Sequence, residues 1–376
     1  MKIEVKEVTN KKIMKLFVKY PDVLYKHDQY YVPTFKADDY DLFNPKKNPY
    51  LKSCDTVGLI VLKDGIVYGR VFGIIQPLDI LEGREKRCRF FYLDTNNDIE
   101  TFSALFDYLK SWALKRGCKN LVGPLGFNDT DREGMLIEGF DTRGTFVSLY
   151  NYPYYLDLME KYGFKKDVDW FQYKLFFTDK VFLDKLDTIA KWILKKGDFR
   201  VLEFKNSKEV VKQYGYQLFE LINKTYSKLY GVVEIEKEII DILLKKFSQI
   251  VSKELIVLVV DKENELAGFA LCFPHISPWL QKSKGRLFPF GFLGLLHNLK
   301  HYDIVDLGLI GVVDKYKNLG LNALMMSYLG IGFKRHNIKH LETNLMLENN
   351  ENILSQMGHL PRVNHKKNRS YILPIE

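Results

Sequence analysis

Two stretches of the 376-residue chain repeat the same order of predicted elements, and this repetition constrains the fold more than any other feature. The order is a β-hairpin, a strand, a helix, a strand, a short helix and a final strand. In the first half these elements are predicted at 56–75, 89–93, 101–115, 120–122, 154–162 and 171–177. In the second half they are predicted at 255–273, 303–313, 321–335, 340–347, 350–357 and 370–373. The pattern predicts two α+β domains related by duplication.

A Lys-rich helical stretch separates the two halves. Apolar residues recur with helical spacing over 178–199, and Gly197 ends the run as a helix C-cap would. We place the boundary there, with a first domain at 1–179, a connecting helix or linker at 180–198 and a second domain at 199–376. Domains of roughly 100–200 residues are the ordinary expectation for a chain of this length.

The composition is that of a folded globular protein, because 46% of the residues are hydrophobic and 27% are charged. This excludes an intrinsically disordered chain. The longest apolar runs, 255–260 and 287–296, are shorter than the roughly 18–20 residues that cross a bilayer. The first 20 residues carry charges throughout and lack the apolar core of a secretory signal. We therefore expect a cytoplasmic protein without a membrane partner.

Four cysteines and eight histidines are spread along the chain, with no Cys-x-x-Cys pair and no Cys/His cluster. This spacing favours reduced thiols over a disulfide scaffold and indicates no metal site. The net charge is 56 − 47 = +9. Because the lysines are dispersed, we interpret the charge as a solvated surface and expect no nucleic-acid partner.

The segment 307–325 forms a strand–turn–helix unit that suits an anion. An apolar strand ends near Val313, a polar turn follows, and a helix begins near Gly320. Such a helix start presents backbone N–H groups and the positive end of the helix dipole to the turn, which is typical of phosphate binding. Lys315 and Lys317 add positive charge. The alternative is an ordinary strand-to-helix turn that binds nothing.

These residues resemble a known family. The run Gly311-Val312-x-x-x-Tyr316-Lys317-x-x-Gly320-Leu321-Asn322 is similar to the pyrophosphate loop of the GNAT superfamily of N-acetyltransferases, which reads Val-x-x-x-Tyr-(Gln/Arg)-x-x-Gly-x-(Gly/Ala). Lys317 and Asn322 depart from that pattern. The stretches 151–164 and 350–358 both resemble the helix that closes a GNAT domain, so the resemblance covers both halves. Three longer segments resemble a bacterial group of tandem GNAT-like proteins of unassigned substrate, at 17–33, 123–141 and 285–291.

The resemblance implies two GNAT-like domains in tandem, each a mostly antiparallel twisted sheet flanked by helices, in the α+β class with a mixed sheet. It also implies an enzyme, an acyl-CoA-dependent N-acyltransferase that uses acetyl-CoA as its co-substrate and a small-molecule amine or a peptide as its acceptor. The CoA is expected on matching residues of the second domain, namely Gly311, Val312, Val313, Lys315, Tyr316, Lys317, Asn318, Leu319, Gly320, Leu321, Asn322 and Asn350. A monomer or a homodimer is expected.

The first half lacks the phosphate loop. Its equivalent turn at 94–100 has three carboxylates and no glycine, so it would repel a pyrophosphate. The first domain is therefore expected to shape an acceptor pocket or to serve as a scaffold. The polar connection at 126–141 is expected to be a loop that covers an acceptor site or an ordinary surface loop. The apolar insertion at 274–291 is expected to pack between domains.

Acyl transfer needs a donor for the thioester carbonyl, a base and an acid. The resemblance suggests a backbone N–H near 311–313 as the donor. Glu342 and Glu348 are candidate catalytic bases, although each could instead form a surface salt bridge. The tyrosine that serves as acid in the family would fall at Leu354, and at Met159 in the first half, and neither residue can donate a proton. The acid is therefore unassigned.

Two other functions fit the sequence. A non-catalytic GNAT-fold protein that binds acyl-CoA or mediates assembly would explain the missing acid and the departure at Asn322. Aminoacyl-tRNA-dependent transfer, as in tandem-GNAT peptidoglycan enzymes, would use the basic charge, but the phosphate loop favours CoA.

Overall fold

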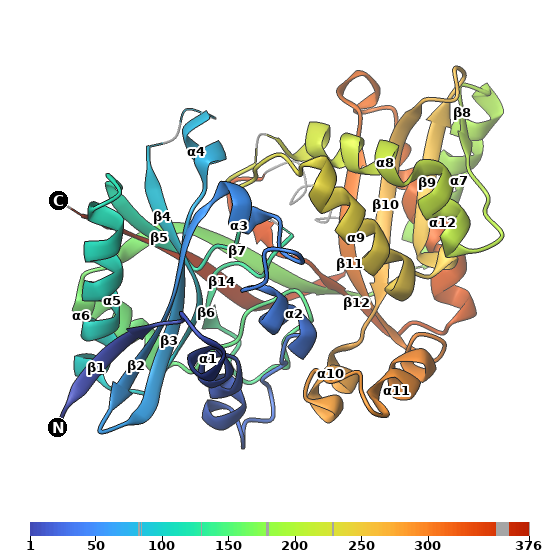
Figure 1. Cartoon of the computed structure of the whole chain (residues 1–376). Helices are drawn as coiled ribbons and strands as arrows, with labels where there is room; N and C mark the ends of the chain where they lie inside the picture. Colours follow the sequence, from blue (N-terminus) through green and yellow to red (C-terminus); the bar gives the residue numbers. More distant parts are fainter. Residues whose placement is uncertain are drawn as a thin grey trace. The chain divides into compact units, whose positions relative to one another are not determined.

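A computed structural model describes residues 1–81, 83, 85–128, 130–177, 180–227, 229–350 and 361–375. The chain forms two compact units, whose elements are labelled in Figure 1. Unit 1 consists of Met1–Phe171, Ser277–Phe292 and His365–Glu376, and unit 2 consists of Gln172–Ile276 and Leu293–Asn364. Each unit includes residues from both halves of the sequence. The predicted domains are contiguous and therefore differ from the units where the chain passes from one unit to the other.

Unit 1 is built on a mixed sheet with the strand order β1-β2-β3-β4-β5-β14. Its strands are β1 (Ile3–Glu7), β2 (Asp55–Lys63), β3 (Ile66–Ile75), β4 (Arg87–Thr95), β5 (Asn120–Gly123), β6 (Met135–Glu138), the first part of β7 (Lys165–Leu175) and most of β14 (Arg362–Pro374). Its helices are α1 (Lys11–Leu24), α2 (Lys36–Asp41), α3 (Tyr50–Ser53), α4 (Pro77–Leu81), α5 (Ile99–Leu114), α6 (Tyr154–Tyr162) and α10 (Ser277–Ser283). The pairing of β4 with β5 is parallel, whereas β1 to β4 pair antiparallel in sequence order.

Helices cover both faces of the unit 1 sheet. Because successive strand residues point to opposite faces, Leu59 and Val61 of β2 pack in the core formed with α5, whereas Ile60 and Leu62 pack in the core formed with α1. The helix α5 has fully buried side chains at the spacing of one helical face, Phe102, Leu105, Phe106 and Leu109.

Unit 2 repeats the arrangement with the strand order β7-β12-β11-β10-β9-β8. Its strands are β8 (Phe199–Val201), β9 (Ile256–Asp261), β10 (Leu266–Pro274), β11 (Ile304–Val312), β12 (His340–Thr343), β13 (Met346–Leu347) and the end of β7. Its helices are α7 (Lys180–Lys196), α8 (Ser207–Tyr226), α9 (Lys237–Ile250) and α12 (Leu321–Arg335), and α11 (Gly291–Asn298) begins in unit 1 and ends in unit 2. The pair β11–β12 is parallel and its sheet neighbours are antiparallel.

The predicted order of hairpin, strand, helix and strand is confirmed in both units, as β2–β3, β4, α5, β5 and as β9–β10, β11, α12, β12. In unit 2, α12 and α7 pack together over one face of the sheet, while α8 packs on β10 and β11 and against α9. The helix predicted as a connection is therefore α7, a structural part of unit 2. The mixed sheet flanked by helices confirms the predicted fold class.

Two predicted stretches differ in the structure. The connection at 126–141 contains strand β6, whose partner is β14, more than 200 residues further along the chain; the register pairs Leu136 with Asn368. Pairing between strands so far apart in the sequence leaves no local pattern of residues. The sequence therefore predicts a loop for this stretch. The helix predicted at 350–357 lies, beyond Asn350, outside the described residues.

The insertion predicted at 274–291 belongs mainly to unit 1. Its Gly285 carbonyl accepts a hydrogen bond from the Lys36 N–H at 2.9 Å, and the Gln281 amide donates to the carbonyls of Gln29 and Tyr31.

Among the described helices, none combines the length and the apolar character that a bilayer crossing needs. All four cysteines are buried free thiols.

Candidate functional site

Strands β11 and β12 separate within unit 2. Their parallel pairing ends at Leu307 opposite Thr343, the last residue of β12, whereas β11 continues to Val312. At Gly308 the register with β10 shifts by one residue, which is a β-bulge. Beyond Leu307, therefore, one edge of β11 is released from its parallel neighbour.

The turn after β11 leads into a helix start without a side-chain cap. A short 3-10 turn spans Asp314–Tyr316, and α12 follows with Gly320 as its N-cap residue. Two residues of this turn have left-handed backbone, Asn318 at φ 65° and Gly320 at φ 84°. Gly320 has no side chain, so the N-cap residue itself makes no side-chain hydrogen bond to the first turn of α12. A helix start of this kind is where backbone N–H groups bind phosphate.

The predicted lysines lie at this turn, and each is close to a carboxylate. The side chains of Lys315 and Lys317 are 61% and 56% exposed, which leaves both able to reach a ligand. The ammonium of Lys315 lies 3.4 Å from a carboxylate oxygen of Asp261, and that of Lys317 lies 2.7 Å from one of Asp314. The Lys317–Asp314 pair is exposed at both ends and therefore weak, while in the Lys315–Asp261 pair only the lysine is exposed; both ammonium groups remain open to an anionic ligand.

Tyr316 contacts the same acidic residue. Its hydroxyl donates to Asp261 at 2.7 Å, and its ring meets that of Phe199 edge-on at 5.0 Å. Although burial raises the pKa of Asp261, hydrogen bonds from Tyr316, from the Glu265 N–H and from Lys315 outweigh it and lower the pKa below its ordinary value. Asp261 is therefore ionised at neutral pH and offsets part of the positive charge of the turn.

Gly320 is required by its conformation and by its neighbour α7. A Cβ on this residue would lie 3.0 Å from the Ile193 side chain and 3.3 Å from that of Ile189. With φ at 84°, any L-residue with a side chain would also be strained. The predicted connecting helix thus supports the turn, a role that the sequence motif does not reveal.

A tyrosine from α8 occupies the released edge of β11. The Tyr226 hydroxyl accepts a hydrogen bond from the Ile310 N–H and donates one to the Ile310 carbonyl, each at 3.1 Å. Strand backbone groups alternate between edges, so the Val312 N–H points to the same edge as that of Ile310. Val313 points to the other edge, where its N–H donates to the Ala267 carbonyl at 3.0 Å. Of the predicted donors near 311–313, the Val312 N–H is the one aimed at the released edge.

We predict that Tyr226→Phe lowers the free energy of unfolding by about 1–2 kcal/mol, because both backbone groups of Ile310 lose a hydrogen-bond partner. Urea denaturation measures the change. The matched control is Tyr216→Phe on the same helix, whose hydroxyl bonds the exposed Asp241. Equal stability of the two variants would contradict the role assigned to Tyr226.

A buried polar cluster lies one residue before the strand separation. Asp306 and Glu342 are direct neighbours in the parallel register, and both are buried, with 3% and 6% exposure. The His275 ring contacts Asp306 at 2.7 Å, while His340 at 3.2 Å and Lys174 at 3.9 Å approach Glu342. Glu342 is a predicted catalytic base, and the alternative was a surface salt bridge; its burial argues against that alternative. Asp306 and His275 were not predicted, because only strand register brings them to Glu342.

The other predicted residues surround the turn or follow β12. Leu321 is a buried core residue, whereas the Leu319 side chain is 48% exposed. Asn322 lies in the first turn of α12. Glu348 follows β13 and is half-buried, and the Asn350 N–H donates to the Leu347 carbonyl at 3.1 Å.

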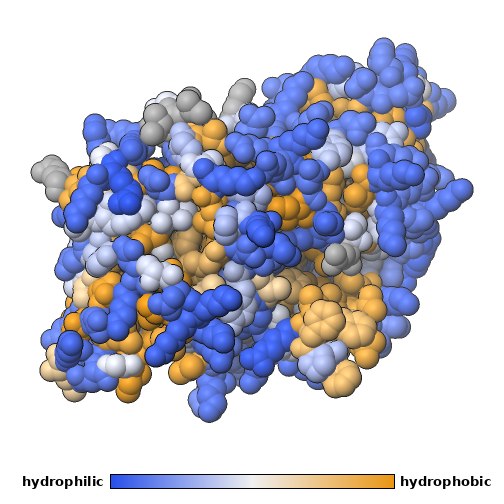
Figure 2. Space-filling view, viewed as in Figure 1, coloured by the Kyte–Doolittle hydropathy of each residue, from blue (hydrophilic) through white to orange (hydrophobic). Residues whose placement is uncertain are grey.

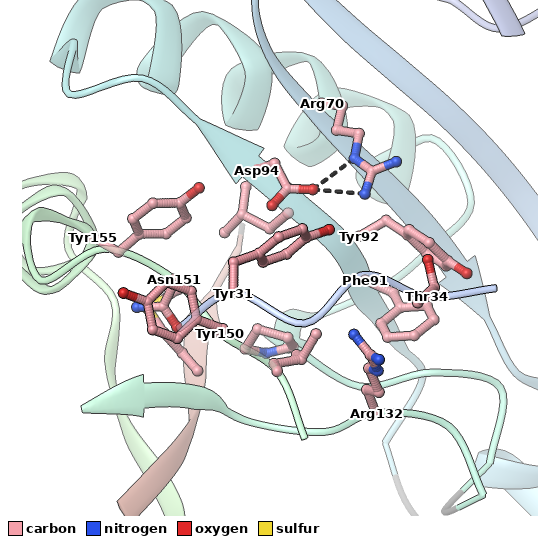
Figure 3. Close-up of a pocket in the computed structure, with 14 residues that line it drawn as sticks. Tyr31, Thr34, Arg70, Phe91, Tyr92, Asp94, Arg132, Tyr150, Asn151 and Tyr155 are labelled. Carbon is pink, nitrogen blue, oxygen red and sulfur yellow. Dashed lines mark hydrogen bonds and ion pairs between the residues drawn. The ribbon is translucent and has the colours of Figure 1, made fainter. Parts of the chain in front are cut away.

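Unit 1 contains a cavity of about 50 Å³ beside the second half of β4, where room exists for a few water molecules. Figure 3 shows the Arg70–Asp94 pair above Tyr31 and Arg132 below it. The lining residues are Tyr31, Thr34, Arg70, Phe91, Tyr92, Leu93, Asp94, Pro124, Arg132, Met135, Leu149, Tyr150, Asn151 and Tyr155.

Paired charges and neutral hydroxyls line this cavity. Arg70 binds one oxygen of Asp94 through Nε at 2.7 Å and a terminal nitrogen at 2.6 Å, and the Tyr25 hydroxyl donates to the other oxygen at 3.0 Å. Burial raises the pKa of Tyr25 and of Tyr155 well above the ordinary value, so both hydroxyls keep their protons. Arg132 donates to three backbone carbonyls, of Phe146, Val32 and Pro33. These hydrogen bonds and ion pairs hold the loops of unit 1 together. Because Tyr25 and Tyr155 keep their protons, neither can serve as an ionised base.

Solved structures share this architecture. A tandem GNAT protein from the clavulanic acid biosynthesis pathway superposes on 100% of this chain and 99% of its own, with a TM-score of 0.56 at 11% identity. A probable N-acyltransferase from Enterococcus faecalis superposes on 100% of this chain and 73% of its own, with a TM-score of 0.53 at 10% identity. The chain has the tandem GNAT fold. A GCN5-related N-acetyltransferase from Anabaena variabilis is similar over the same shares of the two chains, with a TM-score of 0.53 at 9% identity.

Two proteins are similar in sequence over most of the chain. Protein YghO of Escherichia coli is 26% identical, and the match covers 98% of this chain and 94% of YghO. A bacterial ceramide synthase of Caulobacter vibrioides is 25% identical, and the match covers 81% of this chain and 79% of the synthase. No protein-family model matches the chain. The sequence similarity to these two proteins therefore spans both units of the chain.

The two halves of the tandem GNAT fold differ at the turn after the fourth strand of each. In unit 1 the Asp98 carboxylate caps α5 by accepting from the N–H groups of Glu100 and Thr101, at 3.0 and 3.3 Å. Lys63 pairs with Asp98 as well. Two backbone donors at the start of α5 are thus bound to a carboxylate and are not available to a phosphate; that this half repels a pyrophosphate stays a prediction.

Proposed function

We propose that this chain is an acyl-CoA-dependent N-acyltransferase that binds CoA through unit 2. The observation that carries the proposal is the contrast between the two helix starts. The start of α12 follows left-handed Asn318 and has the left-handed Gly320 as an N-cap residue that makes no side-chain bond, whereas the Asp98 side chain caps α5. The uncapped start, with Lys315 and Lys317 beside it, suits the CoA pyrophosphate.

The proposed reaction forms an amide. The amine nitrogen attacks the thioester carbon, the carbon–nitrogen bond forms, the carbon–sulfur bond breaks, and the thiolate leaves. The Val312 N–H would bind the oxygen that gains charge in this step. Glu342 would accept the amine proton through water from its place before the strand separation, with Glu348 as the second candidate base.

The acceptor is proposed to be an amine, and one relative suggests a class to try first. A ceramide is an amide of a long-chain amine, so the name of the Caulobacter vibrioides relative describes N-acylation. Thiol release should therefore be measured with acetyl-CoA and with a long-chain acyl-CoA, each against small amines, peptides and a long-chain amine. Release with one pair alone would identify both substrates.

A second candidate is a non-catalytic acyl-CoA-binding protein, and Tyr226 is the observation that favours it. Its hydroxyl already bonds both backbone groups of Ile310, at the edge where a thioester would have to lie. Tight binding of acetyl-CoA without thiol release to any acceptor would support this candidate over the enzyme.

The binding site is tested by Lys315→Gln/Lys317→Gln. Removal of two charges beside the pyrophosphate should weaken acetyl-CoA binding about tenfold or more in calorimetric titration, because hydrogen bonds to charged groups contribute about 1.5–3 kcal/mol each when well made. The control is Lys339→Gln, which removes an exposed lysine charge elsewhere in unit 2, one that pairs with Asp303. Equal affinity of the double variant and the control would rule out the turn as the CoA site.

A further inference from the structure

A long stretch of the chain carries no acidic residue. Between Glu265 and Asp303 there is neither Asp nor Glu, and Lys282, Lys284 and Arg286 follow one another at alternate positions. All three basic side chains are exposed. A concentrated positive charge without neighbouring carboxylates in the segment contrasts with the dispersed lysines elsewhere.

Large apolar side chains follow directly in the same segment. Phe288 is 78% exposed, Phe290 76% and Phe292 39%, and in α11 Leu293 and Leu296 are 54% and 53% exposed. Figure 2 shows hydrophobic surface in the region where Figure 1 labels α10 and α11. Soluble proteins rarely leave so many large apolar side chains exposed together, because each loses its hydrophobic stabilisation.

The segment is held in place by unit 1. Besides the bonds from Lys36 and Gln281, the Trp279 ring packs on Phe35 at 5.7 Å, and its N–H donates to the Gly291 carbonyl at 2.9 Å. The rings of Phe288 and Phe292 lie 6.1 Å apart. The phenylalanines are thus presented on an anchored loop, which reduces the entropy lost when a partner covers them.

We propose that this loop, residues 282–292, docks the protein on a membrane surface that contains anionic lipids. Phenylalanine side chains insert at the boundary between head groups and acyl chains, and Lys and Arg bind anionic head groups beside them. The segment is basic and has no acidic residue, which favours an anionic bilayer over a second copy of the chain. A symmetric contact between two copies would bring two basic segments together. The prediction of no membrane partner was based on the lack of a membrane-spanning segment. Docking on a surface depends on the exposure of side chains, which the sequence does not reveal.

The test is co-sedimentation of the full-length protein with lipid vesicles. Vesicles of phosphatidylcholine with about a third phosphatidylglycerol should bind the protein, and added salt should weaken binding. Phe288→Ser/Phe290→Ser should lower partitioning at least tenfold. Lys282→Gln/Lys284→Gln should lower it by a similar factor, since each basic residue near an anionic surface contributes roughly fivefold. Pure phosphatidylcholine vesicles should bind less than the anionic ones.

The matched control is Val23→Ser on α1, where another apolar side chain is 70% exposed. Circular dichroism and the Tm verify that all variants are folded. Failure of the natural protein to bind anionic vesicles at low salt would overturn the proposal, as would equal binding of the phenylalanine variant and the control. A dimer in light scattering that Phe288→Ser/Phe290→Ser dissociates, without vesicle binding, would assign the loop to self-association instead. None of these results depends on acyl-CoA binding.

Discussion

Gly320→Glu is expected to abolish measurable acetyl-CoA binding to the chain. The substitution adds a negative charge at the start of α12, where the proposal places the pyrophosphate, and two like charges there repel. The new side chain would also meet Ile193 and Ile189 of α7 at the left-handed φ of 84°. Calorimetric titration with acetyl-CoA measures the loss.

Gly320→Gln separates charge from strain. Glutamine has the same size and the same backbone penalty as glutamate but no charge. If the turn binds the pyrophosphate, the glutamine variant should retain at least tenfold more affinity than the glutamate variant at equal Tm. If both folded variants bind acetyl-CoA as tightly as the natural protein, the proposed CoA site has to be abandoned.

Asp79→Ala is expected to lower the free energy of unfolding by about 3–5 kcal/mol, because it leaves a buried guanidinium without its carboxylate. Asp79 and Arg89 are fully buried, at 0% exposure each. Arg89 binds both oxygens of Asp79, at 3.0 and 2.7 Å, and Arg87 binds both at 3.2 and 3.1 Å. Urea denaturation measures the effect, and Glu85→Gln, which loosens the exposed pair with Lys119, serves as the control with a change near zero.

The same carboxylate predicts an acid dependence. Although burial raises the pKa of Asp79, hydrogen bonds and charge from Arg89 and Arg87 outweigh it, so the pKa in the folded state lies well below the ordinary value of 3.8. A lowered folded pKa means that this stabilisation is complete above the unfolded pKa, near pH 4, and is lost as the pH falls further. Asp79→Asn should therefore lose less stability between pH 5 and pH 3 than the natural protein, and equal slopes would contradict the assignment.

The repeated order of elements could be predicted from sequence because it depends on local signals. The hairpin turn Lys63-Asp64-Gly65 has left-handed backbone at both Asp64 and Gly65, as its residue types suggest. The spacing of buried residues in α5 is that of one helical face. A contrast between the two turns was also predicted, from the three carboxylates and the missing glycine at 94–100; the structure adds that Asp98 is the N-cap of α5, whereas Gly320 is that of α12.

Details of the candidate site could not be predicted, since they arise from contacts between distant residues. Tyr226 meets Ile310 across 84 positions, and Gly320 faces Ile193 of a helix predicted only as a connection. Asp306 joins Glu342 through parallel register alone. A single sequence contains no signal for such pairs, because strand register and helix packing depend on the whole unit.

The sequence by itself determined the element order, the α+β class and the turn at 311–322 that resembles a phosphate-binding loop. Each of these depends on residue types and on their spacing over short stretches of the chain. The tertiary structure decided which segments form a unit. Strand β14 pairs with β5 and β6, and the loop at 282–292 is anchored on unit 1 with its phenylalanines exposed. The physical reason is that burial and strand pairing satisfy groups far apart in sequence, and only the folded chain brings them together.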